Sequence, residues 1–185
     1  MARSREGVGN GPRHSLTPNE IKEMLGLERH PTCGFVAAAY RSSLRIPAEA
    51  LPEAYDEGDR PYASALYFLV TPEAQIVVHW IRSDQLYDHY LGDPLEVLML
   101  YPDSGNGIAA VGLEHQDLRS DMRPQLLIPG GTFHTSRLKA GAAGWALLAS
   151  TEWPGVEPPD VEHGDIKALV EAYPNLRETI HSFTR

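Results

Sequence analysis

Apolar residues recur at short range along the middle of the chain, in segments that turn residues separate from one another. The segment 65–70 (Ala-Leu-Tyr-Phe-Leu-Val) is followed by Thr-Pro-Glu, and 85–91 is followed by Gly-Asp-Pro. Short apolar or alternating runs bounded by Gly, Pro and Asp are typical of β-strands. Strands are predicted over 35–40, 65–70, 75–81, 85–91, 95–101, 108–113, 125–128, 133–138 and 145–150.

Two flanking segments have helical spacing instead. Thr17 and Glu20 have the spacing of a capping box, and Pro18 suits the first helical position. The side chains of this helix that we expect to face the core are Ile21, Met24, Leu25 and Leu27. A second helix is predicted over 165–173, where Ile166, Leu169 and Val170 share one face and Pro174 ends the helix.

The remaining segments lack periodicity. Residues 1–15 are rich in Gly and Arg, and we expect a disordered tail there. Residues 47–63 contain three prolines and several acidic side chains and are expected to form a loop. Many short strands at regular spacing favour a single all-β sandwich or barrel over 16–185, with short flanking helices.

Composition and charge exclude several classes of function. The net charge of −9 argues against nucleic acid and anionic membranes as partners, because both attract clustered Lys and Arg. No apolar run approaches the about 20 residues needed to span a bilayer, and 1–7 lack the apolar core of a secretory signal. The one cysteine, Cys33, makes no disulfide framework. We therefore expect a cytoplasmic protein.

The candidate catalytic and binding residues are concentrated in two segments, 79–92 and 124–134. Alternation along a strand puts Gln85, Tyr87 and His89 on one face. His79 lies on the strand before, and His134 begins the strand that follows a Pro-Gly-Gly turn. We expect these five side chains to share one interior.

The order of these motifs resembles the cupin superfamily. The residues that carry the resemblance are Leu66-Tyr67-Phe68-Leu69, His79, Ser83-Asp84, Gly92-Asp93-Pro94-Leu95, Pro124-Gln125, Pro129-Gly130-Gly131 and Trp153-Pro154-Gly155. The chain looks most like a small single-domain branch usually labelled a domain of unknown function, over roughly 17–174. The resemblance implies a cupin (double-stranded β-helix, jelly-roll) barrel and a homodimer.

The cupin metal signature is only partly present. His79 and His134 match its first and last histidines, and Gly92 matches its glycine. Ile81 stands where the second histidine would be, and Gln85 stands where the glutamate would be. Gln carries no charge and is a poor ligand for a transition metal.

Two chemistries are therefore open. If a divalent metal (Fe, Mn, Ni or Zn) is bound, its ligands are expected to be His79, His134 and His89, as in a metal-dependent oxygenase or lyase. The chemistry that we favour needs no cofactor. A neutral imidazole, His79 or His134, acts as the base, and Tyr87 or Tyr67 acts as the acid. Sugar-epimerising cupins are a metal-free precedent, by resemblance of fold alone.

The predicted function is acid–base isomerisation, epimerisation or cyclisation of a small polar carbonyl-containing metabolite. His79, His134 and Tyr87 would be catalytic, with Gln85 orienting the substrate and His89 and Tyr67 beside it. Arg41 and Arg60 could grip a carboxylate or phosphate at the barrel mouth, or form structural ion pairs. A non-catalytic barrel that only binds a small ligand is the remaining alternative.

Overall fold

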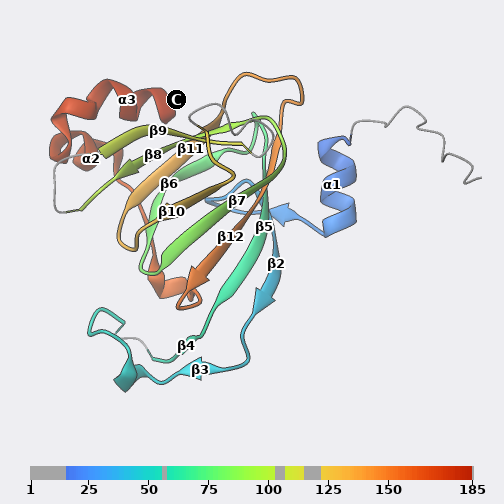
Figure 1. The fold of residues 1–185 in the computed structure, drawn as a ribbon. Coiled ribbons are helices and arrows are strands. Elements are labelled where there is room, and N and C mark those ends of the chain that lie inside the picture. Colours follow the sequence, from blue (N-terminus) through green and yellow to red (C-terminus); the bar gives the residue numbers. More distant parts are fainter. Residues whose placement is uncertain (1–15, 56–57, 103–106, 115–121, 185) are drawn as a thin grey trace, which may run out of the picture.

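The computed structural model describes residues 16–55, 58–102, 107–114 and 122–184, with the backbone alone at 107–111. The predicted tail, 1–15, lies outside the described residues, so its disorder stays a prediction. Two facing antiparallel sheets form the body of the molecule, with helices on two opposite sides of it (Figure 1). The predicted all-β barrel is confirmed.

The larger sheet has six strands in the order β1-β2-β5-β12-β7-β10. These are β1 (Glu28–Arg29), β2 (Phe35–Arg41), β5 (Ser64–Val70), β12 (Ala146–Trp153), β7 (Asp84–Gly92) and β10 (Gln125–Ile128). The second sheet has five strands in the order β13-β6-β11-β8-β9. These are β13 (Val161–His163), β6 (Ile76–Ile81), β11 (Phe133–Leu138), β8 (Leu95–Leu100) and β9 (Gly107–Leu113).

The predicted strands agree with these bounds to within one residue except in β12, which continues three residues past the predicted end. The predicted loop 47–63 contains η1 (Ala48–Ala50) and the strand β4 (Arg60–Pro61), which pairs with β3 (Arg45–Ile46). This β3–β4 hairpin extends away from the barrel (Figure 1). The other short 3-10 helices are η2 (Pro158–Asp160) and η3 (Pro174–Leu176).

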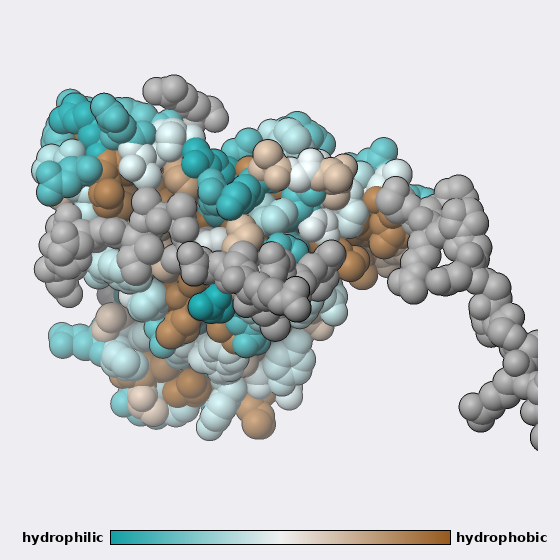
Figure 2. All heavy atoms as spheres, turned by 45° about the horizontal axis from the view of Figure 1, so that its top comes forward, coloured by the Kyte–Doolittle hydropathy of each residue, from teal (hydrophilic) through white to brown (hydrophobic). Residues whose placement is uncertain are grey.

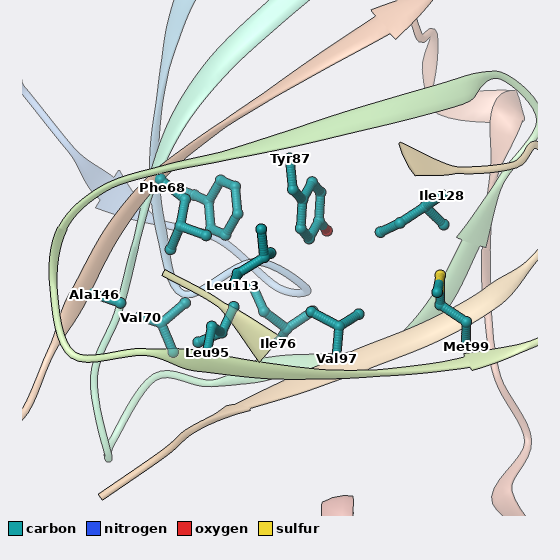
Figure 3. Packing of buried hydrophobic residues seen from close by; sticks show 11 residues of the cluster. Phe68, Val70, Ile76, Tyr87, Leu95, Val97, Met99, Leu113, Ile128 and Ala146 are labelled. Atoms are coloured by element: carbon teal, nitrogen blue, oxygen red, sulfur yellow. The ribbon is translucent and has the colours of Figure 1, made fainter. Parts of the chain in front are cut away.

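The main core lies between the two sheets. Phe68, Tyr87 and Leu148 come from the larger sheet, and Ile76 and Val97 come from the second. Figure 3 shows the Tyr87 and Phe68 rings side by side in the interior, where their centroids are 4.9 Å apart. Burial of this apolar surface from both sheets is what holds the barrel closed.

Three helices cover the outer faces. The helix α1 (Pro18–Leu25) begins at the predicted capping box, in which the Glu20 amide donates to Thr17 Oγ1 at 3.3 Å. Ile21 and Leu27 pack on the larger sheet, whereas Met24 and Leu25 are exposed, so their predicted core positions are wrong. Because α1 is only about two turns long, only a narrow face of it contacts the sheet, and Ile21 is the buried residue on that face.

The C-terminal helices α2 (Ile166–Ala172) and α3 (Arg177–Phe183) pack against Val78 and Leu98 of the second sheet. α3 was not predicted. No helix in the described part of the chain is long and apolar enough to cross a membrane. On the face shown in Figure 2, hydrophobic and hydrophilic residues are interspersed.

Candidate functional site

A cavity of about 230 Å³ lies between the two sheets. Exposed Tyr40 and Arg41 are among its lining residues, so the cavity reaches the surface at the end of β2. The polar side chains that line it include His30, Thr32, Cys33, Arg41, Ser64, His79, Gln85, Tyr87, Ser150 and Glu152. The volume is below the about 300–1,000 Å³ typical of drug-sized ligands, so it suits a small metabolite.

His79 lines the cavity from the second sheet and is almost fully buried. Its Nδ1 lies 2.7 Å from the Val77 carbonyl oxygen, which can only accept, so Nδ1 carries the proton. Nε2 is then an acceptor, and Cys33 Sγ lies 3.9 Å from it. Burial lowers the pKa of His79 from its ordinary 6.5 to about 4, so the ring is neutral at pH 7.

His134 lies behind His79 and Tyr87 rather than on the cavity wall. The two imidazole rings are 4.4 Å apart, and His134 pairs directly with His79 in the β6–β11 ladder. Its Nδ1 lies 3.2 Å from the Thr132 carbonyl oxygen, so Nε2 accepts from the Tyr87 hydroxyl at 3.0 Å. Burial raises the pKa of Tyr87 and lowers that of His134, with the nearby His79 adding to the second effect, so both stay neutral.

A buried carboxyl occupies the opposite wall. Glu152 of β12 pairs with Ser64 of β5 on one side and with Gln85 of β7 on the other. Its two oxygens accept from Ser64 Oγ at 2.6 Å and from Ser150 Oγ at 2.5 Å. Burial raises the pKa of Glu152, and the two serine hydroxyls partly offset that effect.

Gln85 connects this row of side chains to the cavity. Its Nε2 lies 3.4 Å from Ser150 Oγ, whose one proton goes to Glu152. The amide oxygen of Gln85 is buried and accepts no hydrogen bond from the described residues. An unsatisfied buried acceptor is rare in folded proteins and calls for an explanation.

Arg41 lies at the cavity mouth and is about half exposed. Its guanidinium pairs with Glu157 and donates to the Val156 carbonyl oxygen at 3.3 Å. Arg45 lies 3.3 Å from the same Glu157 oxygen. Two guanidinium groups thus share one carboxylate beside the cavity mouth.

The structure places His79, Tyr87, Gln85 and Arg41 in the cavity lining and His134 directly behind His79 and Tyr87. The other three candidates, His89, Tyr67 and Arg60, lie outside the cavity lining. His89 Nε2 donates to the Asp93 carbonyl oxygen at 2.9 Å, outside the cavity lining. Tyr67 points to the outer face, because its neighbours Leu66 and Phe68 face the cavity.

Arg60 is the third candidate that lies outside the cavity lining. It is 1% exposed and forms two hydrogen bonds with Asp160, at 2.7 and 2.8 Å. Of the two roles open to Arg60 from the sequence, the geometry matches the structural ion pair. Its guanidinium faces a fixed carboxylate and not the cavity.

The side chains around the cavity do not form a ligand set for the metal ion that the cupin signature implies. His134 Nε2 is occupied by the Tyr87 hydroxyl, and His89 is remote. Ile81 lines the cavity without a donor. Among the described residues, no three His, Cys, Asp or Glu side chains are grouped so that they could hold a metal ion.

Sequence reasoning missed Glu152, Ser150, Ser64 and Cys33 as site residues. A signal for two of them was present, because Leu148, Ser150 and Glu152 alternate on one face of one strand. The predicted strand ended at residue 150, which hid this pattern. Cys33 enters the site through an isolated bridge to Ile76, which no local pattern indicates.

Comparison with known proteins agrees with the fold. The family model described as Cupin superfamily (DUF985) matches residues 19–164. A protein from Shewanella oneidensis is 25% identical with a TM-score of 0.76, over 92% of this chain and 99% of that one. A hypothetical protein from Leishmania major is 25% identical with a TM-score of 0.79, over 91% and 98%. The search of curated proteins found no match.

Proposed function

The chain belongs to the cupin superfamily (DUF985), and we propose that it is a metal-independent enzyme that moves protons on a small polar carbonyl-containing metabolite. Isomerisation, epimerisation and cyclisation are the reactions of this class. The observation that carries the proposal is a neutral imidazole and a buried carboxyl on facing walls of one small cavity.

His79 is the proposed base. Its Nε2 lone pair takes the proton from the carbon next to the substrate carbonyl, and the C–H electrons move into an enol or enolate. A pKa of about 4 makes the free ring a weak base, but it also keeps the ring unprotonated at neutral pH. The negative charge that develops on the enolate favours the imidazolium that forms beside it.

Glu152 is the proposed second proton carrier. On the wall opposite His79, its carboxylate takes the hydroxyl proton of the enediolate and gives it to the former carbonyl oxygen. The His79 imidazolium then returns its proton to the former carbonyl carbon, so that both side chains end in the state in which they began. Its raised pKa makes it a better acid at neutral pH than an exposed glutamate. Tyr87 orients the substrate oxygen, since its own proton is directed to His134.

The test is hydrogen exchange in deuterated water. Small 2-hydroxy and 2-oxo aldehydes, ketones and acids are incubated with the protein, and NMR follows loss of the carbon-bound proton. We expect exchange with the wild type, loss of at least about 100-fold in His79→Gln, and full exchange in His181→Gln, whose histidine is exposed on α3. Exchange that is equal in wild type and His79→Gln would refute the role of His79.

The same experiment separates the proposal from a barrel that only binds its ligand. If members of the panel bind but none of them exchanges its carbon-bound proton, the result would support a protein that only binds its ligand. Metal content of the purified wild type and of His134→Ala addresses the metal-dependent oxygenase or lyase. A stoichiometric metal that disappears in His134→Ala would contradict the metal-free proposal.

A further inference from the structure

The hydrogen bonds around the cavity leave its buried walls mainly with acceptors and its rim with donors. The direction of each bond follows from groups that can only donate or only accept. His79 gives its Nδ1 proton to the Val77 carbonyl oxygen, so Nε2 can only accept. Tyr87 gives its proton to His134 Nε2, so its oxygen keeps only lone pairs for a ligand.

The opposite wall has the same polarity. Ser64 and Ser150 each have one hydroxyl proton, and both protons go to Glu152. The Val156 amide donates to Ser64 Oγ, and Gln85 Nε2 donates to Ser150 Oγ. Gln85 Oε1 is left as a buried acceptor that none of the described residues satisfies.

The donors lie at the exposed rim. His30 Nδ1 accepts from the Thr32 amide at 3.3 Å, so the proton of the neutral ring is on Nε2. Arg41 adds a guanidinium, which has donors only. Both residues line the cavity and both are exposed. A carboxylate or carbonyl oxygen is therefore matched best at the rim. At the buried walls the acceptors outnumber the donors, which are the weak Cys33 thiol and the second proton of the Gln85 amide.

We infer that the ligand is a small hydroxylated carbonyl compound whose hydroxyl groups enter the cavity and whose anionic or carbonyl end stays beside Arg41. Each hydroxyl brings the proton that the buried acceptors lack, and the orphaned Gln85 Oε1 is one of its partners. This inference rests on the proposed function for the carbonyl group. The hydroxyl preference itself depends only on the direction of the hydrogen bonds.

Three acids of equal carbon number and charge test the inference: propanoate, lactate (both enantiomers) and glycerate (both enantiomers). They carry no, one and two hydroxyl groups. Calorimetry or protein-observed NMR measures their dissociation constants with the wild type. We expect the affinity to rise about 3–10-fold with each hydroxyl of the better enantiomer.

Gln85→Met keeps the approximate size of the side chain and removes its acceptor. The wild type is expected to bind glycerate more tightly than lactate, and we expect Gln85→Met to reduce this ratio of affinities by at least about 3-fold. The exposed control Gln75→Met should leave the ratio unchanged. Equal affinities, an order that favours propanoate, or no binding of glycerate by the wild type would overturn the inference. The wild-type series gives this answer even if Gln85→Met does not fold.

The two proposals fail separately. Preference for hydroxylated acids without any carbon-bound proton exchange would leave the inference standing and contradict the proposed function. Exchange that depends on His79, together with equal affinities for the three acids, would support the proposed function and contradict the inference.

Discussion

The neutral, buried state of His79 should make the stability of the protein depend on pH. The ring has a pKa of about 4 in the folded chain and 6.5 as its ordinary value, with burial as the main cause. Below pH 6.5 the unfolded chain therefore binds a proton that the folded chain refuses. Stability is lost as the pH falls from 6.5 toward 4, and the loss ends once both states are protonated.

The size of the effect follows from the pKa difference. Each unit of pH in this window costs about 1.4 kcal/mol, so His79 alone should lower the free energy of unfolding by about 2 kcal/mol between pH 8 and pH 5. His134 acts in the same direction, because its pKa is also lowered by burial. Replacement of His79 by Gln removes one titrating group and leaves the other.

Urea unfolding at pH 8 and at pH 5 measures the effect. The fall in unfolding free energy between the two conditions should be about 2 kcal/mol smaller in His79→Gln than in the wild type. His181→Gln, at an exposed position on α3, is the control and should follow the wild type. An equal pH dependence in wild type and His79→Gln would show that His79 titrates normally in the folded chain, and the argument for a neutral buried base would fail.

Three further predictions concern the buried polar groups. Asp160→Ala leaves the buried Arg60 without its carboxylate and should lower the unfolding free energy in urea by about 3–5 kcal/mol; a loss below 1 kcal/mol would contradict the assignment. Tyr87→Phe leaves His134 Nε2 unpaired and should cost about 1–3 kcal/mol in the same assay. The Cys33 thiol, whose pKa burial raises to about 11, should react with iodoacetamide at pH 8 at least about 100-fold more slowly than in urea-unfolded protein; equal rates would contradict the raised pKa.

The barrel was predictable because its signals are local. Strands such as β5, β10 and β11 combine short apolar runs with flanking Gly, Pro or Asp residues, and their bounds agree with the sequence pattern. The neighbourhood of His79 and His134 was also predictable, because the two residues match the first and last histidines of the cupin signature. The two residues are direct partners in the β6–β11 ladder.

Some residues lie where the alternation of the strands does not predict them, because their positions depend on long-range features of the fold. A register shift in the β6–β11 ladder lets Ile76, His79 and Ile81 all contact the interior, although strict alternation would separate the first from the other two. Arg60 finds Asp160 across 100 positions of the sequence. His89 is on the expected buried side, but the turn that follows β7 supplies a carbonyl oxygen for its ring.

The glutamine at position 85 can be understood from its partner on the next strand. Gln85 and Glu152 are direct partners in the β7–β12 ladder, where side chains on the same face are about 5 Å apart. A glutamate at 85, as in the metal signature, would put a second carboxyl beside Glu152 in a buried site, and two such carboxylates cannot both ionise without a cation. Gln85 avoids that repulsion and donates to the serine that supports Glu152. The carboxyl of this cavity therefore belongs to the neighbouring strand, where serine hydroxyls stabilise its charge, and a proton-transfer role is more consistent with that arrangement than a ligand role is.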